Sequence, residues 1–77
     1  MTKIFAERLV QKRKEKGLHK TELAAKSGVN VNTITNYEYC NNMPSLYNAC
    51  LIADALEVSL DWLVGREGKH DDRDRNL

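Results

Sequence analysis

The sequence predicts a compact all-α domain of five short helices. Glycine and proline are sparse, and the segments between them have helical lengths. Those segments lack the alternation of apolar and polar residues that is typical of strands. The chain has 77 residues, 42% of them hydrophobic and 30% charged, which is enough for one globular domain and ordinary for its class.

The first helix is expected over about residues 3–16, with Thr2 as its cap and Gly17 as its terminator. Phe5 and Leu9 are four residues apart, so they share one face of this helix. We expect that face to point toward the core.

Two shorter helices should follow, one over about residues 20–27 that stops at Gly28, and one from the capping residue Asn30 to about Tyr39. Their expected inward side chains are Leu23, Ala24, Ile34 and Tyr37.

A fourth helix, about residues 46–56, is expected after Pro44 with Ser45 as its cap. Its predicted inner face holds Leu46, Ala49, Cys50, Ile52, Ala53 and Leu56. The stretch VSLDWLVG predicts a short fifth helix that is capped by Ser59.

The domain is expected to cover residues 1–66. Residues 67–77, EGKHDDRDRNL, are so polar that their composition predicts a disordered tail.

Charge is unevenly distributed along the chain. Residues 1–30 hold eight basic and three acidic side chains, whereas residues 31–66 hold one basic and four acidic. A surface that faces a polyanion and an ordinary solvated helix face are both open interpretations. No apolar run reaches the about 20 residues of a membrane span, and the N-terminus does not resemble a signal peptide. We therefore expect a cytoplasmic protein that does not bind membranes.

The segment AAKSGVN connects the second and third helices. Ala24 allows two helices to approach closely, and Gly28 tolerates a positive φ in a tight turn. This pattern is a helix-turn-helix, whose second helix can enter the major groove of DNA.

The third helix carries an unusual outer stripe. At about 100° per residue, Asn32, Thr35, Asn36 and Tyr39 share one side, with Val31 at its margin. Asn and Thr are poor choices for helix stability alone. One interpretation is therefore a solvent-exposed surface of low helix propensity that has no binding role. Hydrogen bonding to base edges suits them better, since Asn can bind adenine bidentately.

The run LHKTELAAKSGVNVNTITNYEYCNNMPSLYNACLIADALEVSLDWLVG resembles the Cro/lambda-repressor-type helix-turn-helix family over about residues 5–65. The matching positions are Leu18, Glu22, Leu23, Ala24, Gly28, Val29, Thr33, Ile34, Glu38, Pro44, Ser45, Val58, Ser59, Leu60, Asp61, Trp62 and Leu63.

This resemblance implies a lambda-repressor-like fold and assigns roles to particular residues. The side chains implied to face base edges are Val31, Asn32, Thr33, Thr35 and Asn36. The side chains expected to contact phosphates are His19, Lys20, Tyr39, Asn41 and Asn42. It also implies a largely buried ion pair between Arg13 and Glu38.

Several positions depart from the family pattern. His19 replaces the capping serine before the second helix, and Glu57 replaces a glycine that adopts a left-handed conformation. Cys40 stands where the family has a turn glycine, and the loop after it offers Asn41 and Asn42 in place of cations. We expect the missing cations to weaken phosphate binding and its salt dependence.

Other chemistry is not expected. Cys40, Cys50, His19 and His70 lack the spacing of metal ligands, so we predict no metal. No phosphate loop and no nucleophile with a base partner is evident, so we predict no cofactor, no small-molecule ligand and no enzymatic activity. Trp62 is expected in the core or a subunit interface.

The sequence therefore predicts a DNA-binding transcriptional regulator of phage or mobile-element type, acting on double-stranded DNA as a homodimer. The fifth helix and the loop before residue 46 are the candidate dimer contacts. The alternative is a protein-interaction module, antitoxin-like or an anti-repressor partner, that no longer reads DNA.

Overall fold

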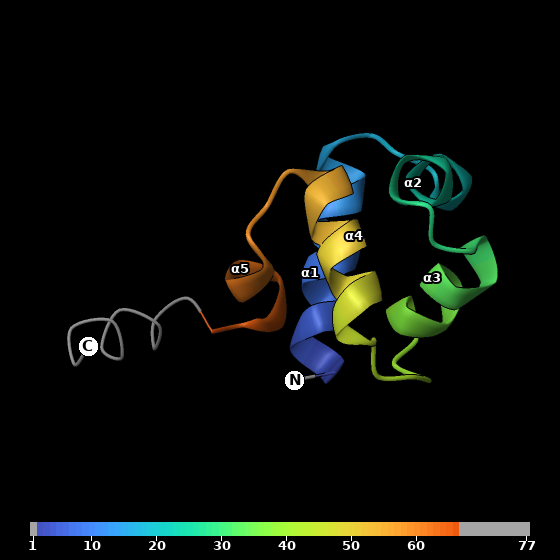
Figure 1. Cartoon of the computed structure of the whole chain (residues 1–77). Coiled ribbons are helices and arrows are strands. Elements are labelled where there is room, and N and C mark those ends of the chain that lie inside the picture. The colour runs from blue at the N-terminus through green and yellow to red at the C-terminus, as the bar shows by residue number, and fades with distance from the viewer. Residues whose placement is uncertain (1, 67–77) are drawn as a thin grey trace.

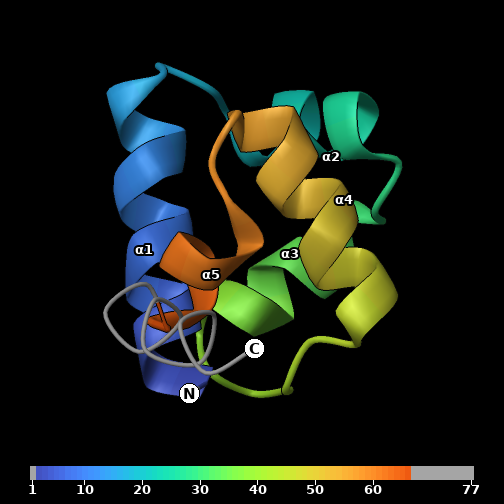
Figure 2. The ribbon, with the colours of Figure 1, turned by 60° about the vertical axis from the view of Figure 1, so that its left-hand side comes forward.

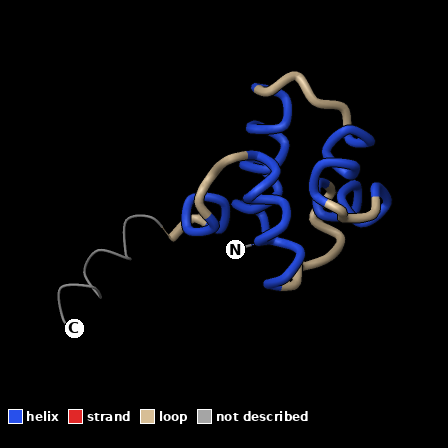
Figure 3. Tube along the Cα trace, turned by 45° about the horizontal axis from the view of Figure 1, so that its top comes forward, coloured by secondary structure: helices blue, strands red, loops and turns tan. Residues whose placement is uncertain are grey.

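The computed structural model describes residues 2–66, and these residues confirm the all-α prediction (Figures 1 and 3). Its helices are α1 (Thr2–Glu15), α2 (Lys20–Ser27), α3 (Val31–Glu38), α4 (Leu46–Leu56) and α5 (Leu60–Val64). The described residues contain no strand, and no helix among them is long and apolar enough to cross a membrane. The predicted tail, residues 67–77, lies outside the described part.

The five helices close a ring around the core. α1 packs against α3 and α5, α2 packs against α3 and α4, and α4 packs against α5. The order around the ring is therefore α1, α3, α2, α4, α5, which differs from the order along the chain (Figure 2). α3 is held between α1 on one side and α2 on the other.

Every helix sends at least one completely buried side chain into the ring. These side chains are Phe5, Leu9, Leu23, Ile34, Ile52, Leu56 and Leu63. The rings of Phe5 and Tyr37 meet edge to face with centroids 5.6 Å apart. The Tyr37 hydroxyl, at the rim, accepts a hydrogen bond from Asn48 Nδ2 at 3.0 Å. Tyr37 thus packs inward, as predicted, without leaving its polar atom unpaired.

Three sequence expectations were wrong in detail. α1 begins at Thr2, so this residue is the first of the helix and not its cap. Leu46 was expected in the core but is 72% exposed, because it is the first residue of α4 and its side chain leans past the helix end. Cys50 is only half-buried, since it lies beside the inward stripe that contains Ala49 and Ile52.

The predicted caps of the later helices are confirmed. Asn30, Ser45 and Ser59 each accept a backbone N–H of the first turn through the side-chain oxygen. The hydrogen bonds that they accept come from Asn32, Asn48 and Trp62 and measure 2.7, 3.1 and 3.0 Å.

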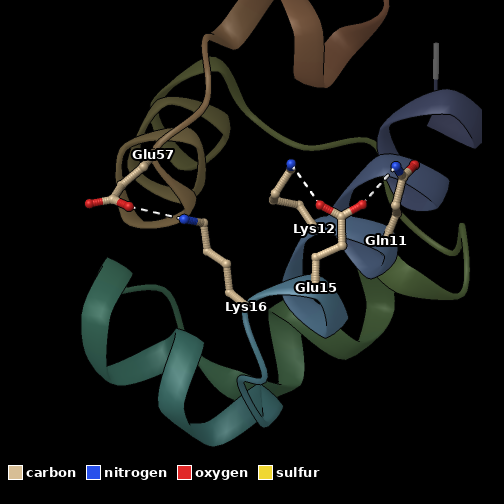
Figure 4. Close-up of polar contacts among 5 residues, drawn as sticks. All are labelled: Gln11, Lys12, Glu15, Lys16 and Glu57. Carbon is tan, nitrogen blue, oxygen red and sulfur yellow. Dashed lines mark hydrogen bonds and ion pairs between the residues drawn. The ribbon is translucent and has the colours of Figure 1, made fainter.

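Among residues 2–66, two that are not glycine occupy the left-handed region, Cys40 with φ 62° after α3 and Glu57 with φ 61° after α4. Both stand where the family pattern has glycine. Glu57 gains a partner from its position, because Lys16 Nζ lies 2.9 Å from its carboxylate (Figure 4). This hydrogen bond lowers the pKa of Glu57 below its ordinary value.

The exposed face of α1 has a second pair of this kind. Lys12 and Gln11 both donate to the Glu15 carboxylate, at 2.8 and 3.1 Å, and lower its pKa (Figure 4). Because the pKa values of Glu15 and Glu57 are lowered, any stabilisation by these pairs exists at neutral pH and is lost as pH falls through the lowered values. The stabilisation is small, since both carboxylates are exposed to solvent.

An ion pair between Arg13 and Glu38 joins α1 to the end of α3. Arg13 Nε lies 2.7 Å from Glu38 Oε2, and Nη2 lies 3.2 Å from Oε1. The third nitrogen, Nη1, donates to the carbonyl of Leu18 at 2.9 Å. The side chains are 11% and 6% exposed, so this pair is bidentate and nearly buried.

Removing one partner of this pair should destabilise the fold. We expect Glu38→Ala to lower the free energy of unfolding by about 3 kcal/mol, because Arg13 is left charged and nearly buried. Urea denaturation followed by circular dichroism measures the change.

The double variant Arg13→Met, Glu38→Leu is the control for that experiment. It removes both charges, so it should lose clearly less stability than Glu38→Ala alone. Equal losses in the two variants would show that packing, and not the stranded charge, sets the cost.

The left-handed position after α3 generates a second prediction. Cys40→Gly should raise the free energy of unfolding by about 0.5–1 kcal/mol, because relief of the strain outweighs the added freedom of glycine in the unfolded chain. Thermal and urea denaturation measure it. Cys40→Ser, which keeps the β-carbon, should leave stability unchanged, and a Gly variant no more stable than the Ser variant would refute the strain argument.

Candidate nucleic-acid interface

The turn between α2 and α3 is held by local hydrogen bonds. Gly28 has φ 79° and donates its N–H to the carbonyl of Ala24 at 2.9 Å. The buried Ser27 hydroxyl accepts the N–H of Val29 at 3.1 Å, and Val29 is itself buried. The turn is therefore anchored in the core and sets the direction in which α3 leaves α2.

α3 separates cleanly into an inner and an outer side. Ile34 is completely buried and Tyr37 is 4% exposed. The residues that are partly or fully exposed include all those expected at base edges: Val31, Asn32, Thr33, Thr35 and Asn36. These side chains are uncharged, and four of the five can donate and accept hydrogen bonds.

The start of α2 and the end of α3 meet at two residues that were expected to contact phosphate. Lys20 Nζ lies 5.2 Å from the centre of the Tyr39 ring, and Tyr39 is 67% exposed. This cation–π contact brings a positive charge and a phenol together beside the outer face of α3. The sequence did not predict their contact.

His19 lies just before α2 and is exposed. Its backbone N–H is used by the Glu22 carboxylate, which accepts it at 2.7 Å. This interaction caps the helix without the serine of the family pattern. Only the ring of His19 is left to approach a phosphate.

The loop after α3 turns back over the helix end. Cys40, Asn41, Asn42 and Met43 are all exposed. Asn41 donates its backbone N–H to the carbonyl of Asn36 at 2.9 Å and its side-chain Nδ2 to Asn36 Oδ1 at 3.3 Å. Sequence reasoning missed this contact, because it depends on the left-handed conformation of Cys40 and not on any helical spacing.

Part of the basic surplus of residues 1–30 is used in ion pairs within the molecule. Lys12, Arg13 and Lys16 each pair with a carboxylate, at 2.8, 2.7 and 2.9 Å. The charge count therefore overstated how much free positive surface this half of the chain has. Lys20 is the cation that the structure brings next to α3.

Trp62 fastens α5 to α1. Arg8 and Lys12 lie over its ring, 5.0 and 5.3 Å from the centre, and Arg8 also donates to the Trp62 carbonyl. The half-buried ring packs against the core, as expected.

Comparison with known proteins identifies similar chains. A segment of 60 residues is 37% identical to a protein of Vibrio cholerae serotype O1 named cryptic phage CTXphi transcriptional repressor RstR. That segment is 78% of this chain and 54% of the relative, so the chain spans about half of the relative's length. No solved structure shows a significant match.

Residues 9–63 match a protein family described as helix-turn-helix. The matched range runs from the middle of α1 to the next-to-last residue of α5. The match covers the turn at Gly28 and both helices that it joins. This chain therefore belongs to the helix-turn-helix family, as its resemblance to Cro/lambda-repressor-type proteins predicted.

Proposed function

We propose that this protein is a sequence-specific transcriptional regulator, a repressor of phage type, that inserts α3 into the major groove of DNA. The outer face of α3 carries this proposal, because it offers uncharged hydrogen-bonding side chains on a helix anchored by the Gly28 turn. The similarity to a protein named as a phage transcriptional repressor supports it. The family consists of DNA-binding regulators, which agrees with the predicted absence of enzymatic activity.

The base-edge readers in this proposal are Val31, Asn32, Thr33, Thr35 and Asn36. This set contains no arginine or lysine, the residues most often used on guanine, so we expect half-sites with A·T pairs. The phosphate contacts come from His19, Lys20, Tyr39, Asn41 and Asn42. With one cation among them, binding should be modest and weakly salt-dependent.

The protein is proposed to bind as a two-fold dimer on half-sites about one helical turn apart. Next to the exposed side chains of Leu46 and Tyr47, an apolar groove runs between α4 and α5. A two-fold arrangement can cover the apolar groove of each copy with the exposed side chains of the other. Sedimentation that finds only monomer, at high concentration and on DNA, would rule this out.

A second candidate function is a protein-interaction module that has lost specific DNA reading. The uncharged loop of Asn41 and Asn42 favours it. Selection of bound sequences from a random DNA pool separates the two. An enriched, roughly palindromic motif supports the regulator, and no enrichment even at low salt supports the interaction module.

Substitutions at the interface should separate base reading from phosphate binding. We expect Asn32→Ala and Asn36→Ala each to cost about 1–3 kcal/mol of binding to the selected site, with little change on unrelated DNA. Lys20→Ala should weaken all sequences similarly. Competition binding assays with specific and random duplexes measure both effects, and circular dichroism checks folding.

Lys14→Ala, an exposed charge change on α1, is the matched control and should leave binding nearly unchanged. If Lys14→Ala weakens binding as much as Lys20→Ala does, the effect of Lys20→Ala reflects general charge and not a phosphate contact at the start of α2.

Restoring a cation to the loop after α3 should strengthen binding. Asn42→Lys is expected to steepen the dependence of log K on log salt by about one unit, because one more phosphate is neutralised. A salt titration with specific and random duplexes measures the slope. Asn42→Gln keeps the side chain neutral and should leave the slope unchanged, and an unchanged slope for the Lys variant would place this loop away from the DNA backbone.

A further inference from the structure

The end of α3 is built so that Asn41 returns to Asn36. The N–H of Asn41 reaches the carbonyl of Asn36 at 2.9 Å, and the N–H of Cys40 reaches the carbonyl of Tyr37 at 3.1 Å. With Cys40 left-handed, these bonds form the Schellman arrangement of a helix C-terminus. These backbone hydrogen bonds hold Asn41 next to Asn36 independently of any contact between their side chains.

In a Schellman arrangement, the side chains at these two positions usually make an apolar contact. Here the side chains of Asn36 and Asn41 make a hydrogen bond instead. Asn41 Nδ2 lies 3.3 Å from Asn36 Oδ1. Asn41 presents Nδ2 and not its own Oδ1 to this contact, so the oxygen end of the Asn36 amide faces Asn41. The reverse pairing, in which Nδ2 of Asn36 donates to Oδ1 of Asn41, would require both amides to turn together.

The Asn36 amide keeps what is needed to read a base. Its oxygen has a second lone pair, and within the described residues its Nδ2 makes no hydrogen bond. Adenine offers the complementary pattern in the major groove, an acceptor at N7 and a donor at N6. If the Asn36 amide were flipped, its Nδ2 would face the N6 amino group of adenine, and two hydrogen-bond donors would meet.

We propose that Asn41 is a positioning residue for base specificity, and that it orients the Asn36 amide for adenine in the major groove. This inference rests on the proposed function and changes the role of Asn41, which the sequence placed at a phosphate. A phosphate contact acts on all sequences alike. An amide held in one orientation acts on the preference at one base pair.

The first experiment needs no DNA. Relaxation of the side-chain ¹⁵N of Asn36 is measured by NMR in the free wild-type protein, Asn41→Ala and Asn42→Ala. The Asn36 order parameter should fall to below about 0.6, the flexible range, only in Asn41→Ala. An Asn36 amide equally mobile in all three proteins would overturn the proposal.

The second experiment measures specificity. Binding constants are determined for the wild-type site and for sites in which each base pair is replaced in turn. The Asn36→Ala variant identifies the base pair that Asn36 reads. At that pair, Asn41→Ala should reduce the preference for adenine by about 3- to 10-fold, a part of what a bidentate contact provides.

Two further variants complete the test. Asn42→Ala is the matched control, and it should weaken all sites uniformly without changing the preference at any pair. Asn41→Asp keeps the size of the side chain but can only accept, so it should draw the Asn36 Nδ2 toward itself and lose the adenine preference at least as strongly as Asn41→Ala. An Asn41→Ala variant that behaves like Asn42→Ala overturns the proposal.

The two experiments together distinguish failure of this inference from failure of the proposed function. If the wild-type protein selects no DNA motif, both the function and the reading role of Asn41 are refuted, even when NMR finds an ordered amide. If a motif is selected but its preferences are insensitive to Asn41→Ala, the function stands and only the positioning role is refuted.

Discussion

The orientation of α3 depends on the nearly buried pair of Arg13 and Glu38. Glu38 is the last residue of α3, and Arg13 holds it by two hydrogen bonds while its third nitrogen holds the chain at Leu18. The pair ties α1 to its neighbour α3 in the ring, in addition to the packing of Phe5 on Tyr37. Its charges are desolvated, so the pair adds geometric definition more than net stability. Because Arg13 holds Glu38, the charged residue of α3 does not lie on its outer face.

Two of the helix ends, those of α3 and α4, are followed by left-handed residues that are not glycine. Glu57 and Cys40 accept a strained conformation that glycine would adopt without cost. At Glu57 a side-chain interaction with Lys16 follows, and at Cys40 the chain is returned so that Asn41 meets Asn36. Strain after α3 is thus coupled to the side chain of a candidate base reader. This coupling links the local backbone to the chemistry of the surface.

The electrostatics of the interface differ from those of the whole chain. On α1, Arg8, Lys12 and Arg13 are engaged by carboxylates or by Trp62, and Lys16, just after α1, pairs with Glu57. Beside α3 the charge comes from Lys20, supported on the Tyr39 ring. In the proposed complex, recognition would therefore draw on hydrogen bonds and close fit more than on phosphate attraction, and it would depend on how the amides of this surface are oriented.

The sequence by itself determined the helices, the caps of α3, α4 and α5, and the two sides of α3. These features follow from local rules, since apolar spacing, capping residues and glycine turns act within a few residues. Its errors at Leu46 and Cys50 arose because Leu46 is the first residue of α4 and Cys50 lies beside the buried stripe and not within it. Only the tertiary structure decided the ring order, the use of the α1 cations, and the contacts of Lys20 with Tyr39 and of Asn41 with Asn36. These contacts depend on distances between separate elements and on a left-handed residue, and no spacing along the chain encodes them.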